Sequence, residues 1–297
     1  MNESSELSII IPAYNEAESL KILLPALIDF CNQNDWNLIV VNDGSRDNTK
    51  EILNTFDATS HYKVVHHKLN KGYGAAIKSG ILACETSYAI TIDADGQHRL
   101  EDVKKLFNCL KKKDADMVVG SRRGIKSATI ARGIGKSIIR MLAKMLMTVD
   151  IYDINSGMKV FRTDLARKYL PLTPDTMAYS DIITLVFINN RHLVIEEPIV
   201  ITNRMSGKST IRVQTAFQTI MEIINILVLF NPMKIFLPIS ILTFIITSIW
   251  GIPLILAGRG VSTGTLLGII SAVIFFVLGL ITEQLAQIRR NQNGSTE

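Results

Sequence analysis

The chain has 297 residues, 47% of them hydrophobic, and a formal net charge of +5 at pH 7. The length exceeds that of one modest domain and the hydrophobic share is high for a fully soluble enzyme, so we expect an apolar part to be segregated from a soluble part. The charge does not indicate nucleic-acid binding, because the basic residues are spread out and no aromatic and basic platform accompanies them. Attraction to an anionic membrane leaflet accounts for the charge better.

Short apolar or β-branched runs alternate with longer amphipathic or capped segments in the N-terminal two thirds of the chain. This alternation predicts an α/β fold with a mostly parallel sheet flanked by helices. The expected strands are Leu7–Ile11, Asn37–Val41, Tyr62–Val65, Tyr88–Ile92 and Asp116–Val119. The first run is too short for a secretory signal and is followed at once by Pro12, so we expect this region to stay in the cytosol.

Polar residues directly follow four of these five strands. They are Pro12-Ala13-Tyr14-Asn15-Glu16, Asn42-Asp43-Gly44-Ser45, Asp93-Ala94-Asp95-Gly96-Gln97-His98 and Gly120-Ser121-Arg122. Ligands of parallel α/β sheets bind beyond the carboxyl ends of the strands, so these segments should converge on one crevice. For any single segment, turn formation and helix capping explain such residues equally well, whereas the combination of four favours a binding site.

The segment after the fourth strand has the features of a cation site. Asp93 and Asp95 are one residue apart at the end of a buried strand, so their carboxylates can present oxygen ligands to a hard cation, and Gln97 can add a neutral oxygen. Mg²⁺ or Mn²⁺ suits such a site, since these ions keep water ligands and complete their shell with substrate phosphate oxygens. The alternative is a solvated turn, because so short a motif also occurs by chance.

An apolar stripe over residues 133–149 predicts an interfacial helix. The stripe consists of Ile134, Ile138, Met141, Leu142, Met145 and Leu146, with the basic residues Lys136, Arg140 and Lys144 elsewhere on the helix. An ordinary amphipathic packing helix explains the pattern equally well. Residues 211–230 have a similar character and are expected to lead the chain to the bilayer.

Two long and almost uncharged segments near the C-terminal end are Ile235–Ala257 and Leu266–Ile281. We expect each to cross the hydrocarbon core of a bilayer, which is about 30 Å thick, as a helix. The short link Gly258–Gly264 predicts a helical hairpin whose two ends return to the same side. Lys234, Arg289 and Arg290 flank the hairpin, and the positive-inside rule then places both flanks and the N-terminal region in the cytoplasm.

Five segments in this order resemble family 2 glycosyltransferases, whose catalytic domain has the GT-A fold. They are Ile11–Glu16, Val41–Ser45, Asn70-Lys71-Gly72-Tyr73-Gly74, Asp93–His98 and Gly120-Ser121-Arg122. The segment Asp153–Gly157 and the two apolar spans narrow the resemblance to one branch of this family, the polyprenyl- and dolichyl-phosphate sugar synthases. Dolichyl-phosphate mannose synthase and bacterial polyprenyl-phosphate glucosyltransferases belong to this branch. The implied parts are a cytoplasmic GT-A domain (1–210), an amphipathic juxtamembrane helix (211–233), two transmembrane helices (234–288) and a cytoplasmic tail (289–297).

The resemblance also implies roles for particular residues. Those expected to bind the donor nucleotide are Pro12, Tyr14, Glu16, Asp43, Lys71, Gly72, Asp93 and Ala94. Those expected to bind Mg²⁺ or Mn²⁺ are Asp93, Asp95 and Gln97. Those expected to contact the acceptor phosphate are Arg122, Arg132, Lys136, Ser137, Arg204 and Ser209. Those expected to be catalytic are Asp93, Asp95 and Arg122.

Three positions in two segments depart from the pattern of these relatives. Arg99 follows His98 where relatives commonly have proline, and Met158 and Lys159 follow Gly157 where relatives often have Phe-Arg. The lysine keeps the positive charge but loses the planar fork of arginine. The prediction of a metal site is unaffected, whereas the transfer of acceptor or sugar contacts through this segment is weakened, which is compatible with a change of donor.

The expected reaction is the metal-dependent, inverting transfer of a single hexose from a nucleotide sugar to undecaprenyl or dolichyl phosphate at the cytoplasmic face of the cell membrane. UDP-glucose is the first candidate donor and GDP-mannose the second. A phosphate monoester has a second pKa of about 6 and is largely dianionic near neutral pH, so no general base is expected. No nucleic-acid partner is expected, and the sequence leaves a homo-oligomer open.

Two other functions stay open. A processive polysaccharide synthase, or another membrane glycolipid glycosyltransferase, could use the same donor site, but the sequence has neither a Q-x-x-R-W acceptor motif nor the additional spans of a channel. A catalytically silent membrane anchor or recruiter on the same fold would tolerate the loss of acidic metal ligands, whereas Asp93 and Asp95 are both present.

Overall fold

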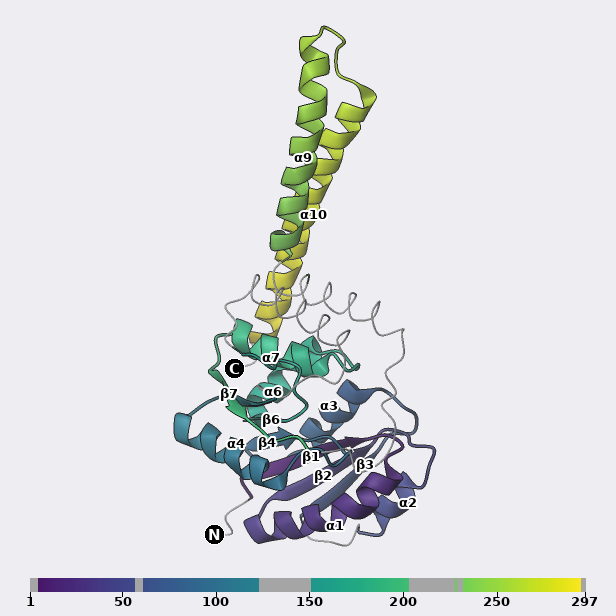
Figure 1. Cartoon of the computed structure of the whole chain (residues 1–297), viewed down its shortest axis with the longest axis vertical. Coiled ribbons are helices and arrows are strands. Elements are labelled where there is room, and N and C mark those ends of the chain that lie inside the picture. The colour runs from purple at the N-terminus through teal and green to yellow at the C-terminus, as the bar shows by residue number, and fades with distance from the viewer. Residues whose placement is uncertain (1–4, 57–60, 123–150, 203–227, 229–231, 295–297) are drawn as a thin grey trace. The chain divides into compact units, whose positions relative to one another are not determined.

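The computed structural model describes residues 5–56, 61–122, 151–202, 228 and 232–294. The chain divides into two compact units, residues 1–130 with 149–211 and residues 131–148 with 212–297. The described part of the first unit is an α/β domain, and that of the second is a pair of long helices (Figure 1). The predicted helices over 133–149 and 211–230 lie outside the described residues.

The first unit is built on a seven-stranded sheet in the order β3-β2-β1-β4-β6-β5-β7. The strands are β1 (Leu7–Ala13), β2 (Asn37–Asn42), β3 (Tyr62–His66), β4 (Tyr88–Thr91), β5 (Met117–Ser121), β6 (Lys159–Arg162) and β7 (Val194–Pro198). β1 pairs in parallel with β2 and β4, β2 with β3, and β5 with β7, whereas β6 lies antiparallel between β4 and β5. The prediction of a mostly parallel sheet and its five strands is confirmed, and β6 and β7 are additions to it.

Helices cover both faces of this sheet because successive strand residues point to opposite sides. They are α1 (Ala17–Asn34), α2 (Thr49–Asn54), α3 (Tyr73–Ala83), α4 (Leu100–Lys113), α6 (Thr163–Tyr169) and α7 (Tyr179–Asn189), with a 3-10 turn at Leu170–Leu172. Ile9 and Ile11 of β1 belong to the core cluster that also contains the buried faces of α1 and α4. Ile10 faces the other side, where a Cβ added at Gly80 of α3 would lie 2.4 Å from its Cγ2.

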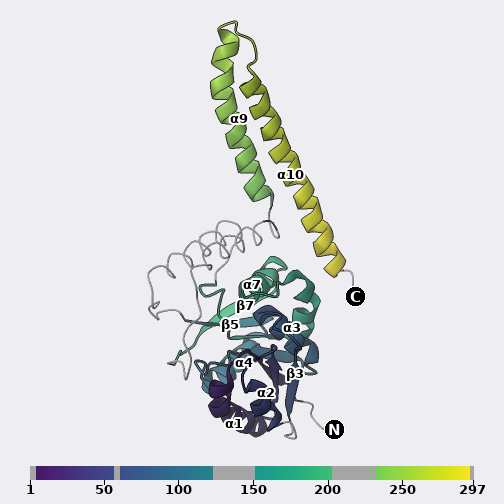
Figure 2. The same cartoon turned by 90° about the vertical axis from the view of Figure 1, so that its right-hand side faces the viewer.

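The second unit is a hairpin of α9 (Met233–Leu256) and α10 (Thr263–Gly294), which run side by side (Figure 2). Both helices are long and apolar enough to cross a membrane, and the two predicted apolar helices are confirmed. Small residues bring the two backbones together, since a Cβ added at Gly251 would lie 2.3 Å from Thr265 Cγ2. Ser240 Oγ donates a hydrogen bond of 2.8 Å to the Ala272 carbonyl across the interface.

Helix α1 offers a matched pair of residues for a test of the core. Leu24 is fully buried, while Ile22 on the same helix is 61% exposed. We expect Leu24→Ala to lower the free energy of unfolding by about 2–5 kcal/mol, because it removes buried methyl groups and leaves a cavity. Ile22→Ala should change it by less than about 0.5 kcal/mol. Urea unfolding followed by tryptophan fluorescence measures both, and equal losses would contradict the assigned burial.

Candidate functional site

The polar edge of the sheet lies at the carboxyl ends of its parallel strands. Ala13 at the end of β1 is in register with Asn42 at the end of β2, and the Asp43 N–H donates a 2.8 Å hydrogen bond to the Ala13 carbonyl. β4 runs in parallel on the other side of β1, so the segment that begins at Asp93 leaves the sheet at the same edge. β5 also runs in this direction, because it is antiparallel to β6 and β6 is antiparallel to β4. The structure therefore brings the predicted segments 12–16, 42–45, 93–98 and 120–122 to the same edge of the sheet, and their role in binding stays a prediction.

Asp43 organises the loop that leads from β3 to α3. Its buried carboxylate accepts hydrogen bonds of 2.9 Å from the backbone N–H groups of Lys71, on Oδ1, and Gly72, on Oδ2. His67 Nδ1 lies 2.6 Å from Oδ1, and its Nε2 lies 2.8 Å from Ser79 Oγ. The carboxylate thus ties three backbone or side-chain donors of one loop to the end of β2, and its contact with a nucleotide stays a prediction.

The start of α3 is fixed by close backbone packing. Gly72 has a φ of 103°, and a Cβ there would lie 2.4 Å from the Asp175 carbonyl oxygen. A Cβ at Gly74 would lie 2.3 Å from the Pro174 carbonyl oxygen, and the Gly74 N–H donates to the Asp175 carbonyl at 2.9 Å. Lys78, one turn further along the helix, pairs with the Asp175 carboxylate at 2.8 Å. Both glycines are needed because no side chain fits against this backbone.

The Asp93 carboxylate is held from two sides at the end of β4. Tyr73, at the start of α3, donates its hydroxyl to Asp93 Oδ1 at 3.2 Å. A Cβ added at Gly157 would lie 2.6 Å from Oδ2 and 2.9 Å from Oδ1, so only glycine fits beside this carboxylate. The Asp93 N–H donates to His98 Nδ1 at 3.1 Å, which requires that nitrogen to carry no proton. Burial, and then the charge of Asp93, raise the pKa of Tyr73 well above its ordinary value, so the phenol stays a donor.

Asp95 and Gln97 form a tight turn beside Asp93. The Gln97 N–H donates to Asp95 Oδ1 at 3.1 Å, and Gly96 between them has a φ of 73°. Within the described part of the chain, no three His, Cys, Asp or Glu side chains converge as a complete cation cage. The roles of Asp93, Asp95 and Gln97 as ligands of Mg²⁺ or Mn²⁺ stay a prediction.

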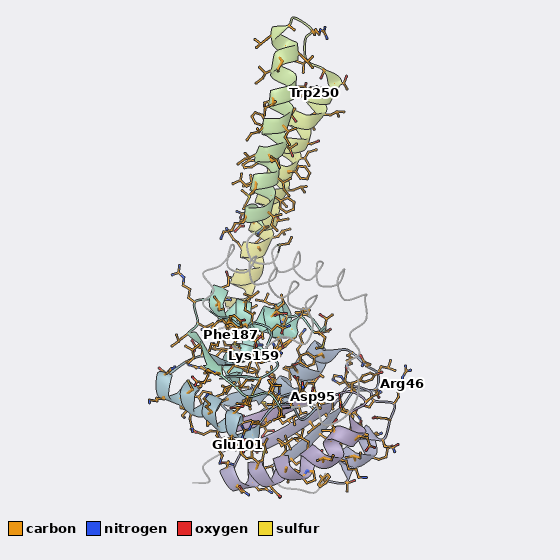
Figure 3. The ribbon with its side chains drawn as sticks, in the orientation of Figure 1. Arg46, Asp95, Glu101, Lys159, Phe187 and Trp250 are labelled. Atoms are coloured by element: carbon orange, nitrogen blue, oxygen red, sulfur yellow. The ribbon has the colours of Figure 1, made fainter. Side chains whose placement is uncertain are left out.

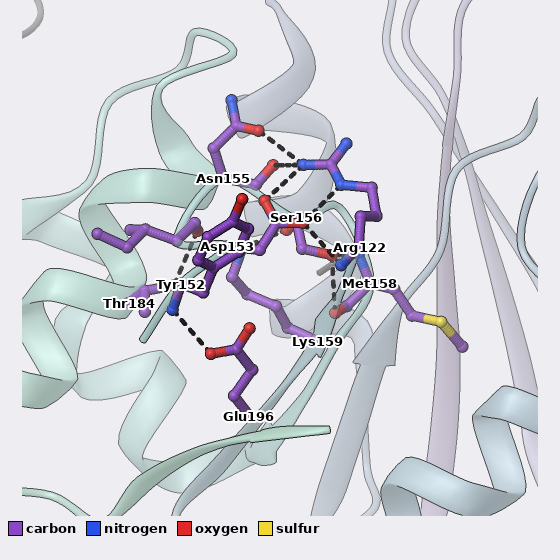
Figure 4. A network of polar contacts seen from close by, with 10 residues as sticks. Arg122, Tyr152, Asp153, Asn155, Ser156, Met158, Lys159, Thr184 and Glu196 are labelled. Carbon is purple, nitrogen blue, oxygen red and sulfur yellow. Dashed lines mark hydrogen bonds and ion pairs between the residues drawn. The ribbon is translucent and has the colours of Figure 1, made fainter. Parts of the chain in front are cut away.

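Arg122, just after β5, is engaged with the turn that follows residue 151 (Figure 4). Its Nε and Nη2 donate to the two carboxylate oxygens of Asp153 at 2.6 and 2.7 Å, a bidentate ion pair. Nη2 also donates to Asn155 Oδ1 at 2.9 Å. The hydrogen bonds that Arg122 donates to Asp153 raise the pKa of the guanidinium, with smaller contributions from the charges of Asp153, Asp93 and Asp181.

Lys159 of β6 is a buried cation next to this ion pair. Its side chain lies inside the domain with only 2% of the residue exposed (Figure 3), and Nζ donates to the Ser156 carbonyl. Burial lowers the pKa of Lys159 to about 8, while the carboxylates of Asp181 and Asp153 act to raise it. A cation in such a place needs these neighbouring charges, since an unpaired buried ammonium is costly.

The other predicted residues have different surroundings. Pro12 and Ala94 are buried, Tyr14 is 41% exposed, and the Glu16 carboxylate accepts a 2.9 Å hydrogen bond from Ser19 Oγ. Five predicted acceptor residues, Arg132, Lys136, Ser137, Arg204 and Ser209, lie outside the described residues.

Sequence reasoning assigned no role to four residues that the structure places in the site: His67, Tyr73, Asp153 and Lys159. Tyr73 could have been found from its position between two glycines in Gly72-Tyr73-Gly74, a segment that also carries the family resemblance. The signal for Lys159 was its departure from the arginine that relatives often have.

A mostly parallel sheet that is flanked by helices on both faces and carries aspartates at one edge has the architecture of the GT-A class of folds. The family model described as Glycosyl transferase family 2 matches residues 8–170, and the chain belongs to this family. A second model, described as the GtrB C-terminal hairpin, matches residues 231–288, which include the two described apolar helices almost completely.

Named relatives agree with this assignment. Polyprenol monophosphomannose synthase of Mycolicibacterium smegmatis is 30% identical over 213 residues, covering 68% of this chain and 79% of that protein. A dolichyl-phosphate beta-glucosyltransferase of Dictyostelium discoideum is 29% identical over 184 residues, covering 56% of either chain, so the match spans less than two thirds of that relative. Glucosyl-3-phosphoglycerate synthase from Mycobacterium tuberculosis, solved with Mn²⁺, UDP and phosphoglyceric acid, shares the fold with a TM-score of 0.56 at 18% identity, covering 75% of this chain and 78% of that one.

The contacts of Asp43 generate a stability prediction. We expect Asp43→Asn to lower the free energy of unfolding by about 1–3 kcal/mol, because an amide turns an N–H₂ group towards at least one of the donors that the carboxylate accepts. Asp29→Asn on the exposed side of α1 is the matched control and should change little. Thermal unfolding in detergent measures both, and an unchanged midpoint for Asp43→Asn would show that the carboxylate does not hold the loop.

Proposed function

We propose that this protein transfers a single hexose from a nucleotide sugar to a polyprenyl phosphate at the cytoplasmic face of a membrane, with inversion at the anomeric carbon. UDP-glucose is the favoured donor and GDP-mannose the next candidate. The observation that carries the proposal is the combination of a family 2 domain, with two aspartates at the end of β4, and a C-terminal pair of apolar helices matched by a hairpin model. Two relatives, a dolichyl-phosphate beta-glucosyltransferase and a polyprenol monophosphomannose synthase, support the same acceptor class.

In this proposal different segments at the sheet edge bind different parts of the nucleotide-sugar donor. The nucleotide would contact Pro12, Tyr14, Glu16, Asp43, Lys71, Gly72, Asp93 and Ala94. Asp93, Asp95 and Gln97 would hold Mg²⁺ or Mn²⁺, which when bound neutralises negative charge on the departing diphosphate. Such a cation would bind more firmly when the donor is present, because two carboxylates and one amide can supply only part of the coordination shell of Mg²⁺ or Mn²⁺ and phosphate and water oxygens complete it.

The acceptor phosphate would meet a set of basic and hydroxyl groups, namely Arg122, Arg132, Lys136, Ser137, Arg204 and Ser209. A phosphate oxygen attacks the anomeric carbon while the bond from that carbon to the nucleoside diphosphate breaks, so the electron pair leaves with the diphosphate. The acceptor is already a dianion near neutral pH, so no protein base is required. What the protein supplies is orientation and positive charge in a site from which water is excluded.

A phase-extraction assay tests the proposed reaction. The full chain in detergent is incubated with radiolabelled UDP-glucose or GDP-mannose, Mn²⁺ and undecaprenyl phosphate, and lipid-soluble label is counted. We expect one sugar for each lipid chain. A polymer would instead indicate a processive synthase, and absence of label with every nucleotide sugar offered would support a silent anchor.

Loss of one metal-site carboxylate gives a sharper test of the same site. We expect Asp95→Ala to reduce product to background, because the cation and the diphosphate lose a charged ligand. Asp29→Ala, on the exposed face of α1, is the control and should retain full activity. Full activity of Asp95→Ala would contradict the metal assignment.

The hydrogen bond to Asp93 predicts a smaller effect on the cation. We expect Tyr73→Phe to weaken Mn²⁺ binding in the presence of UDP by about fivefold, since the carboxylate loses the donor that fixes Oδ1. Tyr62→Phe removes a hydroxyl that donates to the Leu53 carbonyl, away from the sheet edge, and should leave Mn²⁺ affinity unchanged. Electron paramagnetic resonance of free Mn²⁺ measures both, and equal affinities would show that Tyr73 does not position the ligand.

A further inference from the structure

The turn formed by residues 153–156, here called the 153–156 turn, is held between two cations (Figure 4). From the end of β5, Arg122 donates to both oxygens of Asp153, and its Nη2 also reaches the carbonyl and side-chain oxygens of Asn155 at 3.3 and 2.9 Å. From β6, Lys159 donates to the Ser156 carbonyl. Arg122 and Lys159 therefore donate hydrogen bonds to opposite ends of the same four-residue turn.

Neighbouring elements complete this arrangement. Thr184 Oγ1 of α7 lies 3.4 Å from the Ile154 carbonyl, at the limit of a hydrogen bond. The charged groups that act on Lys159 are Asp181 from α7, Asp153 from the 153–156 turn, Arg122 from the end of β5 and Asp93 from the end of β4. Two cations thus stand among three carboxylates, and none of them lies on a freely exposed surface. The lysine is the one member of this group inside the sheet itself.

We propose that Lys159 is a positioning residue for Arg122. By holding the Ser156 carbonyl and compensating the charges of Asp153 and Asp181, it keeps the 153–156 turn in the one arrangement that orients the Arg122 guanidinium. The inference rests on the proposed function in so far as Arg122 is assigned to the acceptor phosphate. Lys159 itself touches neither donor nor acceptor in this proposal and acts only through the turn.

The chemistry of the site explains why the residue is basic. A methionine of similar length would fill the space but leave the Ser156 carbonyl without its donor and the neighbouring carboxylates without a counter-charge. An arginine would keep both the charge and a donor. Lys159→Met and Lys159→Arg therefore separate the polar function of the side chain from its volume.

Steady-state kinetics of the full chain in detergent test the proposal. We expect Lys159→Met to raise KM for undecaprenyl phosphate by about tenfold or more while KM for the nucleotide sugar changes by less than about twofold. Lys159→Arg should stay within about threefold of the wild type for both. Lys63→Met, which removes a half-exposed lysine paired with Glu85, is the matched control and should change neither constant. Equal rises in both KM values for Lys159→Met would overturn the proposal in favour of a merely structural role.

A second measurement does not depend on sugar transfer. Phenylglyoxal modifies arginine side chains that are free to react, and mass spectrometry reads the rate at each site. We expect Arg122 to react about tenfold faster in Lys159→Met than in the wild type, with the exposed Arg46 unchanged. An unchanged rate at Arg122 would overturn the proposal, whereas a wild type without transferase activity but with the faster rate in the variant would overturn only the proposed function.

If the single variant fails to fold, the double variant Lys159→Met with Asp181→Asn, which removes one positive and one negative charge, tests the proposal instead. Removal of one carboxylate together with the lysine restores the balance of buried charge, so the thermal midpoint should return towards that of the wild type. The Ser156 carbonyl still lacks its donor, so fast modification of Arg122 should persist. Slow, wild-type modification in this folded double variant would contradict the proposal.

Discussion

Parallel pairing of β1 with both β2 and β4 is the constraint on which the site depends. Because the three strands run in one direction, the segments that follow them have to leave the sheet at the same edge, however far apart they lie in the chain. The polar groups gathered there then hold one another. Asp43 fixes the loop before α3, α3 presents Tyr73, and Tyr73 meets Asp93. A single architectural rule thus produces a chain of contacts that ends on a carboxylate of the predicted cation site.

The charged side chains at this edge form ion pairs and hydrogen bonds within the protein. Arg122 makes a bidentate pair with Asp153, so a phosphate that binds Arg122 has to share the guanidinium with that carboxylate. Buried ion pairs recover their desolvation cost only when their remaining hydrogen-bonding groups are satisfied, and the 153–156 turn supplies such partners. Groups that are oriented in advance spend little free energy on rearrangement when a ligand arrives, which is how folded enzymes stabilise developing charge.

The sequence carried the information for some parts of this structure and not for others. Largely apolar runs bounded by polar residues predict β1, β2, β4 and β5 well, because strands buried on both faces have this pattern, whereas β3 is a partly exposed edge strand that its β-branched residues still indicate. β6 is four residues long and begins with Lys159, and β7 contains Glu196 and Glu197, so neither has the apolar character of a central strand. The partners of Asp43 and Arg122 are about thirty residues away along the chain, and no local pattern encodes such pairings. The predicted acceptor residues between 132 and 137, and those at 204 and 209, lie outside the described residues.

The place of β6 in the sheet also bears on biosynthesis. β4 and β5 are neighbours in the chain but are not paired with each other, because β6 lies between them and hydrogen-bonds to both. A ribosome completes β5 well before residues 159–162 emerge, and β7 follows later still, so during that interval β4 lacks its partner on one edge and β5 lacks its partners on both edges. Closure of the sheet is therefore a late event in synthesis. A polypeptide interrupted before Arg162 keeps these edges of β4 and β5 open to pairing with other chains, which exposes it to aggregation and to capture by chaperones.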